Sequence, residues 1–336
     1  MTRSPGPHPL PIFLATLQAA CADDPARLAA ALAGLARYQQ APRPAPPPKR
    51  PEVARIGEVS LRGTPGPRPV VIVPSLINPA HVLDLPGRSL MAHLESEGLN
   101  PMIIDWGDSP EPLGLAALVS DRLAPLVNSL QQPVALLGYC LGGTLALALA
   151  AGAPITRLAL IATPWNFAGY GDGQRAALAG WWASAGPMAQ AMGQLPIDLL
   201  QPAFWSLDPD GLAAKYVRLA AASPADVADF VRLEDWANGG TPISLAAAQD
   251  MAALYANGQW DGIDPATITA PILDVIAGTD RIVPPGAALS TLGIGTALRL
   301  DAGHVGMVVG RRAPQMLWEP LVHWLADAAG SARTSA

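Results

Sequence analysis

Cysteine and charge are both scarce in this 336-residue chain. Its two cysteines, Cys21 and Cys140, are too few for a disulfide framework, so the chain suits a reducing compartment and we expect it in the cytoplasm. Charged residues make up 14% of the chain and the net charge is -6, which argues against the basic surface that nucleic-acid binding needs. The five histidines are scattered without metal-ligand spacing, and no C-x-x-C pair occurs, so we expect no metal ion and no other cofactor.

Apolar runs long enough for a membrane span are equally few. Residues 134–151 have the length, but a membrane helix does not explain a run of four aliphatic residues that ends in G-Y-C-L-G-G. Residues 10–20 are apolar and end just before Cys21, as in an exported lipoprotein. Their start holds several prolines, however, and Gln18 stands where a lipoprotein signal has an aliphatic residue. We therefore expect neither a membrane span nor export.

The chemistry of the chain is most evident at residues 134–151. Residues 134–137 predict a short buried strand, G-x-C-x-G follows with Cys140 at its centre, and an Ala/Leu-rich helix comes next. This is the nucleophile-elbow pattern with sulfur in place of the usual serine oxygen. Gly138, Gly142 and Gly143 leave room for the sharp strand-to-helix turn. A thiol at a helix start is favoured as a thiolate, and the backbone N–H of Leu141 can stabilise an oxyanion there.

Two plainer interpretations of the same stretch remain. A lone cysteine is more often a buried structural residue than a nucleophile, although the flanking glycines favour the elbow. A phosphate-binding loop would need a Lys and a Ser or Thr in frame after the glycines, and the sequence has none there.

Strands and helices alternate after residue 51, which predicts an α/β fold with a mostly parallel sheet and helices on both faces. The predicted strands are 56–61 (an edge strand), 70–73, 102–105, 134–137, 158–161, 272–276 and 297–300, and the predicted core helices include 89–97, 113–130 and 314–328.

Three regions follow from this pattern. Residues 1–51 comprise an irregular start (1–20), an amphipathic helix from Asp23 and a Pro-rich linker over 41–51. That helix either packs on the rest of the chain or docks a partner. Residues 52–164 and 270–330 form the core, and residues 165–269, here called the cap segment, form a mainly helical insertion. Six of the nine tryptophans lie in the cap segment, which indicates a lid over the elbow (Trp165, Trp181, Trp182, Trp205, Trp236 and Trp260).

Chain order predicts the partners of the cysteine. In the α/β-hydrolase fold an acid follows a late strand, and a histidine follows the last strand. Asp280 in GTDRIVPP and His304 in GHVGM take these places, whereas Asp274 lies within a strand and Asp301 is too close to His304 to orient its ring. A second oxyanion donor is expected in the loop after strand 70–73, at Leu76 or Ile77.

Sulfur as the nucleophile favours one kind of reaction. A thiolate that attacks a thioester forms another thioester, so the acyl group stays activated for transfer to a hydroxyl. A serine would serve ester hydrolysis equally well. The cysteine, under an apolar cap segment, therefore favours acyl transfer.

Several segments resemble the polyhydroxyalkanoate synthases in the same order: PSLINPAHVLDL, IIDWGDSP, GYCLGGTLA, LEDWANGGTP, GTDRIVPP and GHVGMVVG. The resemblance covers residue 70 to the C-terminus. It implies polymerisation of (R)-3-hydroxyacyl-CoA with release of CoA, in which Cys140 carries the acyl chain, His304 activates thiol and hydroxyl, and Asp280 supports His304.

The short N-terminal part is similar to the catalytic subunit of the two-subunit (class III) synthases. This implies an acyl-CoA substrate, a polyester product, a second subunit, a homodimer or hetero-oligomer, and a place on polyester granules. Tyr139, His81 and Trp236 are the candidate substrate-binding residues. The chain departs from the family at Tyr255, Ala256 and Asn257, where the family has Tyr-x-x-Asn, and at Pro79 and His81, where aromatics are common.

Other functions stay open at this stage. Dienelactone hydrolases have an almost identical elbow but a compact core, whereas here the cap segment separates Cys140 from Asp280. A cysteine-dependent polyhydroxyalkanoate depolymerase or thioesterase would use the same residues, because the fold does not decide whether water or a hydroxyl attacks. A non-catalytic granule-associated scaffold is the alternative of another class.

Overall fold

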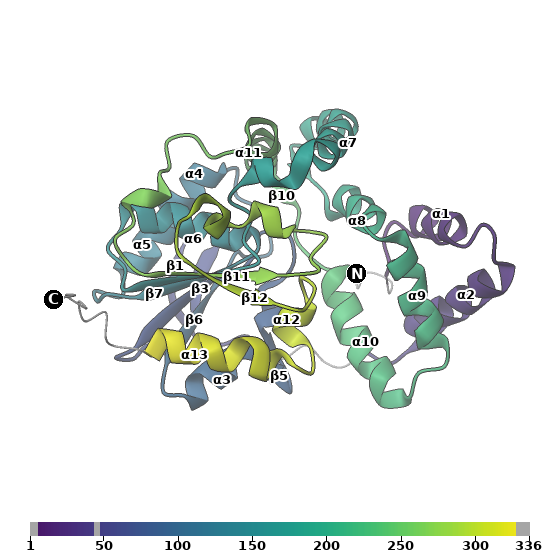
Figure 1. Ribbon diagram of the computed structural model, residues 1–336, viewed down its shortest axis with the longest axis horizontal. Helices are drawn as coiled ribbons and strands as arrows, with labels where there is room; N and C mark the ends of the chain where they lie inside the picture. The colour runs from purple at the N-terminus through teal and green to yellow at the C-terminus, as the bar shows by residue number, and fades with distance from the viewer. Residues whose placement is uncertain (1–5, 44–47, 327–336) are drawn as a thin grey trace.

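An eight-stranded sheet forms the centre of the computed structural model, which describes residues 6–43 and 48–326 (Figure 1). Its strand order is β1-β2-β6-β3-β7-β8-β11-β12. The strands are β1 (Glu52–Ile56), β2 (Val59–Gly63), β3 (Pro69–Val73), β6 (Asn100–Asp105), β7 (Ala135–Tyr139), β8 (Arg157–Ile161), β11 (Ile272–Ala277) and β12 (Thr296–Leu300). All pairs from β6 to β12 are parallel, while β1 and β2 are antiparallel additions at one edge. The predicted mostly parallel sheet is confirmed.

Helices cover both faces of this sheet, as predicted (Figure 1). The helices are α1 (Leu10–Ala20), α2 (Pro25–Gln40), α3 (Leu90–Ser96), α4 (Leu115–Leu118), α5 (Ala124–Asn128), α6 (Leu141–Gly152), α7 (Gly171–Met192), α8 (Ile197–Ser206), α9 (Pro209–Ala220), α10 (Pro224–Ala237), α11 (Leu245–Asn257), α12 (Gly306–Val309) and α13 (Glu319–Ala326). Helices α4, α5 and α6 pack on one face, and α3, α12 and α13 on the other.

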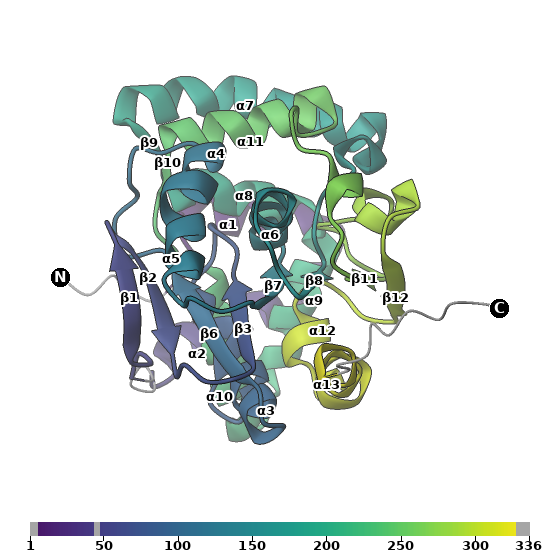
Figure 2. The same cartoon turned by 90° about the vertical axis from the view of Figure 1, so that its left-hand side faces the viewer.

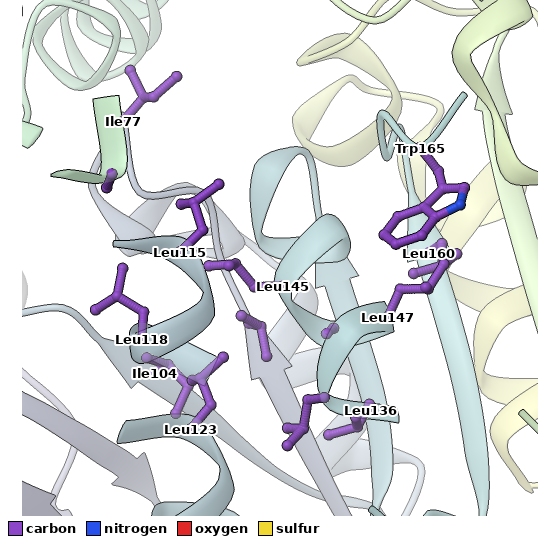
Figure 3. Close-up of a cluster of buried hydrophobic side chains, with 14 of the residues drawn as sticks. Ile77, Ile104, Leu115, Leu118, Leu123, Leu136, Leu145, Leu147, Leu160 and Trp165 are labelled. Atoms are coloured by element: carbon purple, nitrogen blue, oxygen red, sulfur yellow. The ribbon is translucent and has the colours of Figure 1, made fainter. Parts of the chain in front are cut away.

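The core on the α6 face is built from aliphatic side chains (Figure 3). Leu145 and Leu147 of α6 pack with Leu136 of β7 and Leu160 of β8, and all four are fully buried. Burying a leucine side chain is worth about 1.5–3 kcal/mol. Residues 134–151 are therefore almost all apolar because they form a strand and a helix that are buried at the centre of the fold. No helix in the part of the chain that the structure describes is both long and apolar enough to span a membrane.

The predicted edge strand 56–61 is wrong. The chain forms a hairpin there, in which β1 ends at Ile56, β2 begins at Val59, and these two residues pair across the turn. Gly57 has φ 61°, which glycine adopts without strain at the first position of a two-residue loop. The stretch is thus two antiparallel strands and a turn.

Helix 113–130 is shorter than predicted and irregular, with α4 and α5 joined by a wider helical turn over Val119–Leu123. The C-terminal helix, predicted over 314–328, is described to residue 326; residues 327 and 328 lie outside the described part of the chain.

The cap segment contains α7 to α11 and two short strands, β9 (Gln194–Leu195) and β10 (Ile243–Ser244), which pair with each other. A second short pair, β4 (Asp84–Leu85) and β5 (Arg88–Ser89), precedes α3. Helices α7 and α11 lie side by side above α6 (Figure 2). The boundaries of the three predicted regions stay a prediction.

The N-terminal helices pack on the cap segment (Figure 1). Gly34 of α2 lies so close to α9 that a Cβ atom would be 1.9 Å from the carbonyl oxygen of Tyr216. The Tyr38 hydroxyl donates to Asp235 of α10 at 2.5 Å. The predicted helix from Asp23 is observed as α2. The irregular start predicted over residues 1–20 is wrong for residues 10–20, which form α1; its proline lies in the first turn, where a helix tolerates it. Residues 1–5 of that start, and residues 44–47 of the predicted linker, lie outside the described residues.

Candidate active site

Cys140 lies between a strand and a helix with strained backbone geometry. It follows the last residue of β7 and immediately precedes α6, with φ 54° and ψ -132°. A positive φ is costly for a residue with a side chain and concentrates at functional sites. The Cys140 N–H donates to the carbonyl oxygen of Ile161 at 2.9 Å, which ties the turn to the end of β8. The thiol is partly exposed, as a nucleophile requires.

Glycine is required around Cys140 because neighbouring segments lie too close to leave room for a Cβ atom. A Cβ atom on Gly138 would lie 2.3 Å from the Cα of Gly143, and one on Gly143 would lie 1.8 Å from Thr163 Oγ1. A Cβ on Gly142 would lie 2.2 Å from the carbonyl oxygen of Val73. Since these neighbours belong to β3, α6 and the segment after β8, the glycines let three elements meet at the cysteine.

Asp280 and His304 meet beside Cys140. Asp280 follows β11 and His304 follows β12, so both stand at the carboxyl ends of parallel strands. His304 Nδ1 lies 2.6 Å from Asp280 Oδ2, and both side chains are almost completely buried. The other carboxylate oxygen of Asp280 accepts the N–H groups of Ile282 and Val283 at 2.8 and 2.9 Å. The carboxylate is thus held in one orientation toward the imidazole.

The His304 imidazole is held in its protonated form. Burial alone lowers its pKa, but the charge of Cys140, the hydrogen bonds with Asp280 and Cys140, and the charge of Asp280 outweigh burial and raise the pKa to about 10. His304 thus interacts with both Cys140 and Asp280, as the predicted triad requires.

We expect His304 to stay protonated through neutral pH and to lose its proton near pH 10. Because Cys140 is the largest of the influences that raise this pKa, Cys140→Ala should shift the titration to lower pH. Titration of the imidazole nitrogen resonances by NMR measures both values. An unchanged titration in Cys140→Ala would show that the cysteine does not interact with His304.

The alternative acids are less suited to this role. Asp274 lies within β11 and is completely buried, and its Oδ2 accepts the N–H of Ser290 at 2.7 Å. Burial raises its pKa. Among the described residues, no cluster of three or more His, Cys, Asp or Glu side chains is arranged to hold a metal ion.

The loop after β3 lies directly against the elbow, as the contact between Gly142 and Val73 requires. Leu141 is the first residue of α6, where backbone N–H groups have no partner within the helix. The Ile77 N–H donates to Ser75 Oγ at 3.2 Å, so it is already engaged. The choice between Leu76 and Ile77 as the second oxyanion donor stays a prediction.

The three candidate substrate-binding residues lie in different surroundings. Tyr139 is buried, and its hydroxyl donates to the carbonyl oxygen of His304 at 3.3 Å, so it holds the histidine loop. Trp236 lines the cavity, and its indole N–H donates to the carbonyl oxygen of Pro79 at 2.8 Å. His81 is exposed and is not among the residues that line the cavity.

Two of the motif segments pack against each other near the site. Asn78 donates from its side-chain amide to the carbonyl oxygens of Ala237 and Gly239 at 3.1 and 3.3 Å. Gly240, with φ 142°, passes so close to the loop that a Cβ would lie 2.4 Å from the carbonyl oxygen of Ile77. The NGG sequence of the cap segment thus fits the loop after β3.

A cavity of about 1010 Å³ opens above Cys140. Its floor includes Cys140 and His304, and its walls come from α7, α8, α9, α10 and α11 of the cap segment. Most of the lining is apolar, with Trp181 and Phe204 among the large side chains. Two tyrosines also lie in this wall, Tyr170 and Tyr255. Tyr255 was noted in the sequence only as a departure from the family pattern, and Tyr170 was not predicted as a site residue.

The chain is a distant homologue of the poly(3-hydroxyalkanoate) polymerase subunit PhaC. It is 28% identical to the subunit from Haloferax mediterranei over 293 residues, which cover 77% of this chain and 58% of that protein. With the subunit from Synechocystis sp. the identity is 29% over 301 residues, or 78% of this chain and 79% of that one. The match thus spans less than two thirds of the Haloferax protein. No protein-family model matches the chain. The resemblance inferred from the motifs is confirmed as distant homology.

Solved structures show the fold. The putative non-heme bromoperoxidase BpoC from Mycobacterium tuberculosis H37Rv superposes with a TM-score of 0.54 at 18% identity, covering 82% of this chain and 98% of that one. The monoacylglycerol lipase from Paleococcus ferrophilus also gives 0.54 at 18% identity, covering 80% and 97%. The chain has the α/β-hydrolase fold, as predicted.

Proposed function

We propose that this protein is an acyltransferase that polymerises (R)-3-hydroxyacyl-CoA thioesters into polyhydroxyalkanoate through a covalent acyl group on Cys140. The observation that carries the proposal is a cysteine, in place of a serine, at the strained elbow beside the His304–Asp280 pair. Distant homology to PhaC and an apolar cavity above the sulfur support it.

Acylation begins with the Cys140 thiolate, which attacks the carbonyl carbon of the thioester. The N–H groups of Leu141 and Leu76 are the proposed donors to the oxyanion that forms. The tetrahedral species collapses, the bond to the CoA sulfur breaks, and the leaving thiolate can take the proton held on His304. One thioester has replaced another, so the step needs little free energy and the acyl group stays activated.

Transfer uses the same histidine in its neutral form. The 3-hydroxyl of an incoming unit attacks the acyl carbonyl, and His304 Nε2 takes the hydroxyl proton. An ester bond forms, and the Cys140 thiolate is released. Asp280 keeps the Nδ1 proton of His304 in place and stabilises the imidazolium, because its own orientation is fixed by two backbone N–H groups.

The apolar cavity favours a hydroxyl over water as the second nucleophile. A site whose lining is mostly apolar limits the water that can reach an acyl-enzyme. It also suits an apolar polyester. We propose that CoA thioesters are the substrates, that the protein works at the surface of polyester granules, and that it associates as a homodimer or with a second subunit, since the PhaC relatives are named as subunits.

Incubation of the purified protein with (R)-3-hydroxybutyryl-CoA tests this proposal. We expect release of CoA together with ester-linked oligomers or polymer. CoA release with free 3-hydroxybutyrate as the product would instead assign the protein as a thioesterase. Activity on polyester fragments alone would assign a depolymerase, and no activity in any arm would favour a granule-associated scaffold.

A further inference from the structure

Two tyrosine hydroxyls meet inside the cavity. Tyr170, at the end of the helical turn Phe167–Tyr170, lies with its hydroxyl oxygen 3.4 Å from that of Tyr255 on α11. The two rings are edge to face with centroids 5.0 Å apart. Phe167 completes the group, stacked on Tyr170 at 6.4 Å and edge to face with Tyr255 at 5.2 Å. We call the two hydroxyl-bearing residues the tyrosine pair.

The tyrosine pair faces the same space as the nucleophile. Tyr170, Tyr255, Cys140 and His304 all line the one cavity. Burial raises the pKa of Tyr170 well above its usual value, and the nearby Tyr255, Cys140 and Asp280 raise it further. Burial and the charge of Cys140 raise the pKa of Tyr255 to about 12. Both hydroxyls therefore stay protonated at neutral pH, within reach of the charge at the active site.

One hydroxyl proton of the tyrosine pair is left for a ligand. Two hydroxyl groups share a single hydrogen bond between their oxygens, so the pair has one more proton than that bond uses. Among the described residues, the 3.4 Å contact is the hydrogen bond that the structure assigns to these hydroxyls. A buried hydroxyl proton without an acceptor costs free energy, and in a cavity wall it points to a polar atom of the ligand.

The position of Tyr170 is fixed by the loop that follows Asp280. A Cβ on Gly169 would lie 1.9 Å from the carbonyl oxygen of Gly286, so the two backbones touch. Asn166 donates from its side chain to the same carbonyl oxygen at 3.1 Å, and its backbone N–H donates to Ala287 at 2.9 Å. The backbone next to Tyr170 is thus held by the segment that also carries the proposed acid. A polar group on such a rigid support can determine specificity.

We propose that the tyrosine pair binds the 3-hydroxyl group of the acyl chain on Cys140, and so selects 3-hydroxyacyl over unsubstituted acyl thioesters. The inference rests on the proposed acyl-Cys140. A 3-hydroxyacyl group carries its hydroxyl two carbon atoms beyond the thioester carbonyl, and this is the polar group that distinguishes it from a simple acyl group in a cavity whose lining is mostly apolar. The oxygen of this hydroxyl can accept the free proton of the tyrosine pair, while the hydroxyl that gives its proton to His304 is that of the incoming unit.

Single-turnover acylation of Cys140 tests the inference. Enzyme in excess is mixed with (R)-3-hydroxybutyryl-CoA or with butyryl-CoA, which lacks the hydroxyl, and CoA release and the mass of the Cys140 peptide are followed. We expect the wild type to prefer the hydroxylated substrate. Tyr170→Phe should slow acylation by that substrate about tenfold, the loss of one hydrogen bond, and leave the rate with butyryl-CoA nearly unchanged.

Butyryl-CoA also shows that the variant is folded, because its rate depends on the same elbow and triad. Tyr38→Phe is the matched control: it removes another buried tyrosine hydroxyl, which bonds to Asp235 outside the cavity lining. The ratio of the two rates should be kept in this control. If Tyr170→Phe left the ratio of the rates with (R)-3-hydroxybutyryl-CoA and butyryl-CoA unchanged, the role of the tyrosine pair would be overturned. No CoA release from either substrate in the wild type would instead overturn the proposed function.

Discussion

Cys140→Ala should lower CoA release from (R)-3-hydroxybutyryl-CoA by about 10³-fold or more. The proposed mechanism passes through a bond to this sulfur, and loss of a nucleophile costs at least that much in enzymes that use a triad. The rest of the site would stay in place, because alanine occupies no more space than cysteine and the backbone turn is held by the hydrogen bond to Ile161. Release of CoA, followed with a thiol reagent, measures the loss.

Cys21→Ala is the matched control for that experiment. Cys21 is the other cysteine of the chain, buried in the cluster between the N-terminal helices and the cap segment, and it is not among the residues that line the cavity. We expect it to release CoA at the wild-type rate. Full activity in Cys140→Ala, or equal losses in the two variants, would contradict a role for Cys140 as the nucleophile.

Gly142→Ala should lower the free energy of unfolding by about 3 kcal/mol, near the upper end of the usual cost of overpacking. The added methyl group would lie 2.2 Å from the carbonyl oxygen of Val73 and 2.3 Å from that of Pro74. Both are backbone atoms at the end of a central strand, so neither can move aside cheaply. The same collision would displace the oxyanion donors, and CoA release should fall as well. Denaturant unfolding measures the stability change.

Gly152→Ala gives a control in the same helix. Gly152 is the last residue of α6, and a Cβ there would meet no atom within 4 Å. Alanine is the better helix former, so this variant should be as stable as the wild type or slightly more stable. If both substitutions had the same effect, the close approach of α6 to the end of β3 would not be what requires glycine at residue 142.

The sheet and the grouping of the three central residues could be predicted because each leaves a local signal. Parallel strands buried on both faces appear in the sequence as short aliphatic runs, and six of the seven predicted strands lie within two residues of the observed strands at both ends. The exception is 56–61. In a sheet of this kind the carboxyl ends of the strands meet at one edge, so the order Cys140, Asp280, His304 was enough to bring these residues together.

Other features depend on contacts between distant segments, which leave little trace in the sequence. The hairpin at Gly57 resembles one strand in the sequence because apolar residues lie on both sides of a turn of only two residues, at Ile56, Val59 and Leu61. Helix α1 has a proline, Pro11, in its first turn, where a helix tolerates it. The helix is stabilised by packing of Phe13 and Leu17 in the cluster with α9.

The substrate-binding residues were the least predictable. Trp236 and Tyr139 line the cavity, but their polar atoms are hydrogen-bonded to backbone carbonyls of other loops. Tyr170 has no motif of its own. Its place becomes evident only when the turn after β8 is seen against the loop after Asp280, a contact made by two glycines. Such tertiary contacts determine where ligand-binding side chains lie, and a single sequence does not show these contacts.

The proposed function depends most on where the acyl group of Cys140 goes. The direct measurement is the balance of products from (R)-3-hydroxybutyryl-CoA: CoA released, free 3-hydroxybutyrate, and ester-linked chains, all from one reaction of the wild-type protein. We predict that the amount of CoA released exceeds the amount of free 3-hydroxybutyrate by a wide margin and that the difference is recovered as ester-linked chains. One molecule of free 3-hydroxybutyrate for each CoA, with no ester-linked product, would contradict it and show that water attacks the acyl-enzyme.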